Sequence, residues 1–219
     1  MNEMMHMPKY MEFAVQYAAL LLCISIHESS HALSAHLLGD DTAKNQGRIS
    51  LNPLAHIDIF GTVIFPLMAF FMNIPVIGWA KPVMVNEINL RDAKRDDILI
   101  SAAGPVSNLF AAFLLFCLYP VMSGLATTVP VIFTFYFFAL LINIYLAFFN
   151  LIPIPPLDGS GIVRGFLTDK MTEKYDLLRG YMGFILIYVL MLSGVFRFIF
   201  ELAGSFLVSL EIATGIKIY

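Results

Sequence analysis

The chain has 219 residues, of which 59% are apolar and 13% are charged, and its formal net charge at pH 7 is -3. About a quarter of the residues in an average soluble domain are charged, so this composition excludes an ordinary soluble globular protein. The scattered Lys and Arg residues form no basic stripe, so we expect no nucleic-acid partner. Because a hydrophobic span takes roughly 20 residues, about five or six spans would use the whole chain.

The first strong apolar run covers residues 11–38. As a helix it would be roughly 42 Å long, which is enough to cross a bilayer. The acidic Glu3 and Glu12 around Lys9 do not fit the layout of a cleaved signal peptide, so we expect the run to be retained. In the polar loop that follows, polar and apolar residues alternate over 48–52, which predicts a short surface strand.

The second apolar stretch, residues 57–79, is interrupted by glycine, proline and asparagine, which argues against one straight helix. Two further apolar runs cover residues 98–119 and 131–150. The last run, residues 181–213, contains Arg197 and Glu201, which are spaced to pair on a helix, and it is counted as two shorter or tilted segments.

These runs predict an all-α polytopic membrane protein. We expect about five or six transmembrane helices, a re-entrant or broken segment and short surface strands. The whole chain, residues 1–219, is interpreted as a single transmembrane domain.

Residues 27–31 read HESSH, an HExxH motif inside the first apolar run. On a helix, His27 and His31 are about 40° apart, so both imidazoles face one side and can bind a single Zn²⁺. Glu28 is about 100° round the helix from His27, where it can accept a proton from a water molecule beside the metal. A chance HExxH on a surface helix would merely be solvated, but ionisable groups at membrane depth are costly and usually functional.

Two histidines leave a catalytic tetrahedral zinc site one protein ligand short, since one position stays open for water. Asp158 is the best candidate for the third ligand. It follows a proline-rich stretch that cannot continue a helix, and Gly159 permits a tight reversal that would aim the carboxylate inward. The alternative is an ordinary turn at the membrane surface.

Two more motifs follow the HExxH motif in the chain. They are Gly104-Pro105-x-x-Asn108 in a middle span and Asn150-x-x-Pro153-x-Pro155-x-Leu157-Asp158-Gly159 after a later one. The three together resemble the site-2 protease family of intramembrane zinc metalloproteases, over most of residues 20–165. The resemblance is to short bacterial and archaeal members, without PDZ-like or CBS-like domains.

The resemblance implies one Zn²⁺ per chain, with His27, His31 and Asp158 as ligands and Glu28 as the catalytic glutamate. It implies that Asn108 also acts at the active site, although this side chain could instead hydrogen-bond across a close helix contact. The metal-site core would cover residues 11–165, and C-terminal helices would cover residues 181–213. The implied activity is regulated intramembrane proteolysis of a transmembrane protein substrate in the lipid bilayer.

Two other functions are compatible with the same residues. A metal transporter or sensor would use these ligands without hydrolysis, and an inactive relative would only bind membrane proteins. The role of Glu28 distinguishes a transporter from a protease. A transporter would use Glu28 as a metal ligand, whereas a protease needs it free to hold a water molecule. His56 is a further polar candidate near the metal, although an interfacial loop histidine is the simpler interpretation.

Topology decides whether the ligands can meet. If residues 57–79 enter and leave the membrane on the same side, the end of the first span and the end of the 131–150 span, which leads to Asp158, lie on the same side of the membrane. In that arrangement the loop Lys and Arg residues also share this face and leave Lys9 opposite. The positive-inside rule then favours a prokaryotic cell membrane protein whose site opens toward the cytosol.

Overall fold

A computed structural model of the chain describes residues 7–72, 78–178 and 180–216, and every regular element in these ranges is a helix. The elements are α1 (Lys9–Leu37), α2 (Thr42–Asn45), η1 (Pro53–His56), η2 (Ile59–Ile64), α3 (Phe65–Met72), η3 (Glu87–Asn89), α4 (Ala93–Ser123), α5 (Pro130–Asn150), α6 (Asp158–Phe166), α7 (Asp169–Asp176), α8 (Tyr181–Ser193) and α9 (Val195–Thr214). The predicted all-α class is therefore confirmed.

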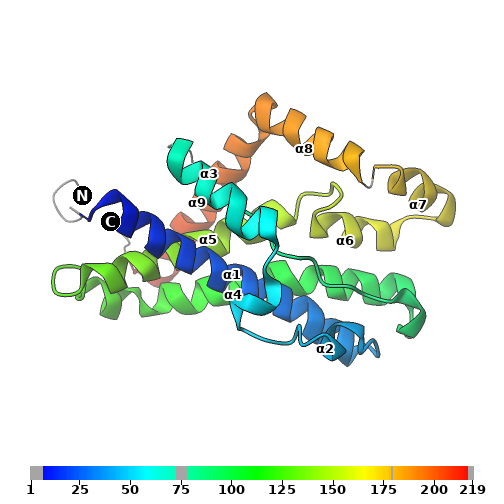
Figure 1. Cartoon of the computed structure of the whole chain (residues 1–219), viewed down its shortest axis with the longest axis horizontal. Coiled ribbons are helices and arrows are strands. Elements are labelled where there is room, and N and C mark those ends of the chain that lie inside the picture. The colour runs from blue at the N-terminus through cyan, green and yellow to red at the C-terminus, as the bar shows by residue number, and fades with distance from the viewer. Residues whose placement is uncertain (1–6, 73–77, 179, 217–219) are drawn as a thin grey trace.

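Three long helices, α1, α4 and α5, form the centre of the molecule and lie side by side (Figure 1). Each is long and apolar enough to cross a membrane, and they match the spans predicted at 11–38, 98–119 and 131–150. Helix α4 begins earlier than predicted because the Asp92 side chain caps it by accepting a hydrogen bond from Arg95 N at 3.2 Å. Phe116 of α4 and Leu140 of α5 are fully buried in the core where these helices meet.

The segment between α1 and α4 leaves and returns at the same end of the bundle. Asp40, just after α1, accepts hydrogen bonds from Asn86 N and Asn89 Nδ2, both at 2.8 Å. Lys81 N likewise donates to His56 O at 2.9 Å. The prediction of a re-entrant or broken segment is therefore confirmed, although the predicted breaks at Asn73 and Pro75 lie outside the described residues.

The surface strand predicted at residues 48–52 is wrong. This stretch is irregular, and no strand occurs in the ranges that the structure describes. The Arg48 guanidinium, with the residue only 3% exposed, donates to the carbonyl oxygens of Ala55, Lys81 and Pro82. A side chain thus satisfies backbone acceptors that a neighbouring strand would otherwise have used.

The C-terminal apolar region forms two helices, α8 and α9, as predicted. They separate at Gly194, whose φ of 84° is in the left-handed region that glycine adopts readily. The break thus precedes Arg197 and Glu201, whose side chains pair within α9 at 3.0 Å. Helix α8, with 13 residues, is shorter than the roughly 20 residues of a straight span.

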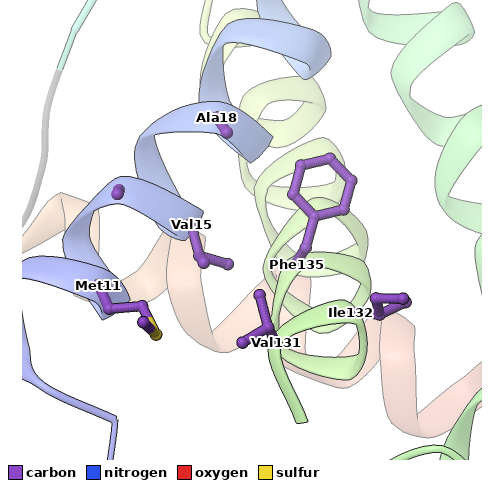
Figure 2. A pocket seen from close by; sticks show the side chains of 7 residues that line it. Met11, Val15, Ala18, Val131, Ile132 and Phe135 are labelled. Atoms are coloured by element: carbon purple, nitrogen blue, oxygen red, sulfur yellow. The ribbon is translucent and has the colours of Figure 1, made fainter. Parts of the chain in front are cut away.

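Near their N-terminal ends α1 and α5 line an open apolar pocket (Figure 2). It is lined by Met11, Ala14, Val15, Ala18, Val131, Ile132 and Phe135. None of these side chains is a His, Cys, Asp or Glu, and none can donate a proton. His27 lies nine residues beyond Ala18 on the same helix, which is roughly 13 Å along the axis. The pocket is therefore distinct from the candidate site.

Accessibility labelling tests the topology of the bundle. Lys94 Nζ is 2.7 Å from Asp169 Oδ1, which places the start of α4 beside α7. Cysteines replacing Lys94 and Lys170 should therefore react with an impermeant thiol reagent from the same side of the membrane. A cysteine replacing Thr128, in the exposed turn between α4 and α5, should react from the other side.

The labelling is best done in a Cys117→Ser background, because Cys117 is exposed and Cys23 is buried. Labelling of positions 94 and 170 from opposite sides would contradict the re-entrant arrangement.

Candidate metal centre

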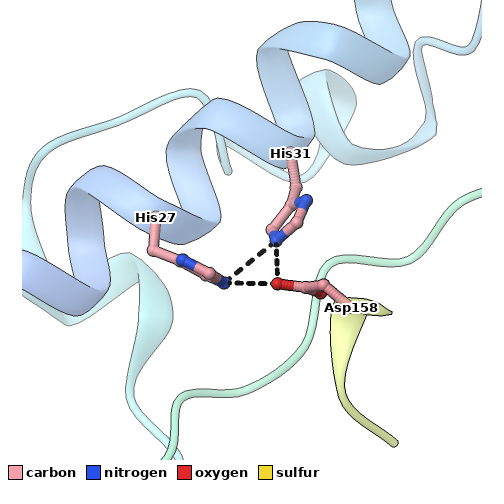
Figure 3. Close-up of side chains that lie close together, drawn as sticks. All are labelled: His27, His31 and Asp158. Atoms are coloured by element: carbon pink, nitrogen blue, oxygen red, sulfur yellow. Dashed lines mark hydrogen bonds and ion pairs between the residues drawn. The ribbon is translucent and has the colours of Figure 1, made fainter. Parts of the chain in front are cut away.

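Three side chains converge where α1 meets the start of α6 (Figure 3). His27 and His31 project from one face of α1 and are 5% and 7% exposed. Asp158 Oδ2 is 2.9 Å from His27 Nε2 and 3.3 Å from His31 Nε2, and the two Nε2 atoms are 3.1 Å apart. Ligand atoms around a tetrahedral zinc ion with bonds of about 2.0 to 2.2 Å are roughly 3.3 to 3.6 Å apart. The three predicted ligands are therefore at nearly the required separation.

The far side of each imidazole faces a hydrogen-bond acceptor. His31 Nδ1 is 2.7 Å from the carbonyl oxygen of Ile100, and His27 Nδ1 is 2.5 Å from Asn108 Oδ1. Both Nδ1 atoms therefore carry a hydrogen, and in the neutral ring each Nε2 presents a lone pair. Hydrogen bonds of this kind fix the tautomer and orientation of metal-bound histidines.

The facing atoms of the cluster are thus three electron-pair donors. Asp158 Oδ2 is buried and has no hydrogen-bond donor in the part of the chain that the structure describes. Three such atoms within about 3.3 Å of one another repel unless a cation lies between them, because their lone pairs share one small volume. The residues present therefore fit a zinc ion.

Gly104 makes room for the two histidines against α4. A Cβ at this position would lie 2.4 Å from His31 Nε2 and 2.6 Å from His27 Cε1. Both contacts are far closer than van der Waals packing allows. Only glycine at position 104 therefore lets α4 approach the imidazoles, which gives a physical reason for the glycine of the Gly104-Pro105-x-x-Asn108 motif.

Helix α6 carries Asp158 at its first turn and packs closely on α4. A Cβ at Gly161 would be 2.0 Å from Ser101 Oγ, and a Cβ at Gly165 would be 2.2 Å from Ile98 Cγ1. Small residues four apart let two helices approach each other in this way. This glycine face was not predicted, although the Gly-x-x-x-Gly spacing of Gly161 and Gly165 is visible in the sequence.

Arg164 holds α6 in place through charges. Its guanidinium is 2.7 Å from Glu87, 3.3 Å from Asp97 and 3.5 Å from Asp176. Burial alone would lower the pKa of Arg164, but its hydrogen bond to Glu87 and the charges of all three acids raise it. The charged guanidinium therefore joins α6 to α4, to η3 and to α7, and so restrains the helix that presents Asp158.

The other predicted residues lie around this cluster. Glu28 is half-buried, and its carboxylate has no hydrogen-bond or salt-bridge partner among the described residues. Asn108 is completely buried and contacts His27 from the side away from Asp158. His56 is also buried, with Nε2 2.8 Å from Ser50 O, and does not belong to the group of potential ligands formed by His27, His31 and Asp158.

Comparison with known proteins gives the family. Residues 124–192 match the family described as Peptidase family M50. The chain is 36% identical over 179 residues to YwhC of Bacillus subtilis strain 168, covering 80% of this chain and 78% of that protein. It is 27% identical over 195 residues to Rip2 of Mycolicibacterium smegmatis, covering 89% of this chain and 73% of that protein. Both relatives are named as putative zinc metalloproteases. No solved structure matches the chain.

The family matches agree with the apolar helices and with the three-ligand cluster in the structure. The cofactor is Zn²⁺, and the long apolar helices make the chain a multi-pass membrane protein. The chain therefore belongs to peptidase family M50, the site-2 protease family of membrane zinc metalloproteases.

Proposed function

We propose that this protein is an intramembrane zinc endopeptidase of the HExxH type that cleaves transmembrane protein substrates in regulated intramembrane proteolysis. The observation that carries the proposal is that Asp158, which is distant in the sequence, meets His27 and His31 of the HExxH motif at zinc-ligand separations. These three residues would hold one Zn²⁺ per chain. Glu28 would be the general base, and Asn108 would hold His27.

Bound zinc supplies a Lewis acid that lowers the pKa of water and polarises a peptide carbonyl. Glu28 would take the proton of the attacking water while the water oxygen bonds to the carbonyl carbon. When the C–N bond breaks, Glu28 would return that proton to the amine nitrogen. Glu28 lies outside the ligand group of His27, His31 and Asp158, which supports this role over the metal transporter or sensor.

The position of the site suits a substrate that crosses the membrane. His27 lies ten residues before Leu37, the last residue of α1, which is roughly 15 Å along the helix axis. A helical substrate hides its backbone carbonyls in its own hydrogen bonds, so it would have to unwind locally before Glu28 could act. A transmembrane helix weakened by Gly or Pro is therefore the expected class of substrate.

The proposal extends to organisation and orientation. Residues 1–219 would form one transmembrane protease domain, with a metal-site core over 11–165 and C-terminal helices over 181–213. The loop cations at the end of the bundle near α2 and α7 favour a cytosolic position for that end. The active site of a bacterial cell membrane protein would then open toward the cytosol.

Removal and return of the metal test this function. Purified chain in lipid vesicles, with a single-span substrate whose helix contains a Gly-Pro step, should cleave that substrate. Treatment with a zinc chelator should abolish cleavage, and added Zn²⁺ should restore it. Mg²⁺ should not restore it, because Mg²⁺ requires octahedral oxygen ligands and this site offers two imidazoles. Full cleavage by metal-free protein would contradict the proposal.

A further inference from the structure

We propose that Asn143, on α5, is a positioning residue for the metal centre. It holds the Asn108 amide in the orientation that makes His27 a zinc ligand. The inference rests on the proposed zinc site. Neither the HExxH motif nor the aspartate motif includes this residue, which lies within the long, largely apolar helix α5.

Asn143 belongs to a buried hydrogen-bonded chain that joins three helices. Its Oδ1 accepts from Asn108 Nδ2 at 2.6 Å. Its Nδ2 donates to Ala139 O at 2.8 Å and to Cys23 Sγ at 3.0 Å. The two asparagines are 1% and 0% exposed. The chain therefore runs from α5 through α4 to the imidazole of His27 on α1.

Two backbone carbonyls fix the direction of this chain. Ala139 O can only accept a hydrogen bond, so the NH₂ group of Asn143 must face it and its oxygen must face Asn108. Cys23 O, 3.2 Å from Asn108 Nδ2, likewise can only accept. Both amide hydrogens of Asn108 are thus used, and its oxygen is left facing His27. His27 Nδ1 must then be the protonated nitrogen.

The alternative orientation of Asn108 is strongly disfavoured while Asn143 is present. A flipped Asn108 amide would place its oxygen against Cys23 O and Asn143 Oδ1, and its NH₂ group against His27 Nδ1. His27 would then present Nδ1 as an acceptor and carry its hydrogen on Nε2, which faces the other ligands. Water cannot relieve such a mismatch at a site this buried. Asn143 therefore stabilises the zinc-binding tautomer from a neighbouring helix.

Polar residues between membrane helices often serve only to hold the helices together. That role would change the stability of the bundle but would not depend on Asn108. The positioning role makes a different demand, because Asn143 would act on zinc only through the Asn108 amide. A double-mutant comparison distinguishes the two roles.

The test measures the zinc affinity of the purified full-length chain by competition with a chelator. Asn143→Leu removes the acceptor at similar volume and should weaken zinc binding by up to about 10- to 100-fold, the loss typical for a residue that hydrogen-bonds a ligand directly, as Asn108 does. The visible spectrum of the Co²⁺-loaded variant should also change, because the orientation of one ligand is altered. Thr134→Val, a buried polar change on the same helix, is the matched control and should leave both readouts unchanged.

In an Asn108→Leu background, Asn143→Leu should change zinc affinity by less than about twofold. Asn143→Asp should restore affinity to within a few-fold, because a protonated carboxyl keeps an acceptor toward Asn108 and a donor toward Ala139 O. If Asn143→Leu does not fold, Asn143→Thr tests the same loss, since its hydroxyl bonds to its own helix and does not reach Asn108.

Zinc affinity unchanged by Asn143→Leu, or effects of the two asparagine variants that simply add, would overturn the inference and leave the proposed protease function intact. Wild-type protein that binds no zinc would instead overturn the proposed function itself.

Discussion

Glu28→Gln is expected to leave zinc bound and to lower the rate of substrate cleavage by about 10²- to 10⁴-fold, the usual contribution of a general base. Gln keeps the size of the side chain and can still hydrogen-bond to water, but it cannot accept the proton. Glu28 lies outside the cluster of His27, His31 and Asp158 that could hold the metal, so metal content should stay near one zinc per chain. In this variant metal analysis should therefore show bound zinc, while the assay in lipid vesicles should show a large loss of cleavage.

Glu12→Gln is the matched control, because Glu12 lies in the first turn of the same helix and is far from the cluster. It should retain both zinc and cleavage. Loss of zinc in Glu28→Gln would make Glu28 a ligand and would favour the transporter. Retention of zinc together with full cleavage would show that the hydrolytic mechanism proposed here is wrong.

The same variant identifies natural substrates. Cells that produce the wild-type chain and cells that produce Glu28→Gln should differ in the membrane-protein fragments that proteomics detects. Fragments present only with an intact Glu28 would define the cleaved proteins and the depth of the cleaved bond.

Much of the fold could be predicted because a membrane imposes strong local rules. Each long helix is an apolar run, so α1, α4 and α5 could be located from composition alone. The re-entrant segment could be inferred because proline and glycine interrupt the apolar run over residues 57–79, and irregular backbone at depth is tolerated where it is buried in protein. The contacts of Asp40 with Asn86 and Asn89, which close that segment, join residues too far apart to be paired from sequence.

The incorrect strand prediction at residues 48–52 has a specific cause. Alternation of polar and apolar residues indicates a strand only where a partner backbone is available. Here the side chain of Arg48 occupies the carbonyl oxygens of Ala55, Lys81 and Pro82. A buried arginine can replace a strand ladder in this way, and its local sequence gives no sign of doing so.

The parts of the candidate site that could be predicted were those with a short spacing or a motif. HExxH places His27 and His31 on one helix face by geometry alone. The resemblance to the site-2 protease family implies that Asp158 is the third zinc ligand. Asn143 and Arg164 were missed because their contacts join helices that are far apart in the sequence, and an asparagine or arginine by itself carries no such information.

Asp158→Ala is expected to remove zinc almost completely. This variant tests the proposed ligand that lies farthest in the sequence from the HExxH motif. A ligand lost from a three-residue set should reduce affinity by more than the 10- to 100-fold typical of an outer hydrogen-bond partner. The reason is structural: Asp158 Oδ2 is the only carboxylate oxygen within the cluster among the described residues, and it contributes the negative charge. His27→Ala and His31→Ala should lose zinc to a similar degree, and in all three variants metal content and cleavage should fall together.

Asp169→Ala is the control. It removes an exposed carboxylate from the neighbouring α7 and should keep both zinc and cleavage. Full zinc retention by Asp158→Ala, with loss in both histidine variants, would require another residue as the third ligand, because two imidazoles alone cannot hold a catalytic zinc ion tightly.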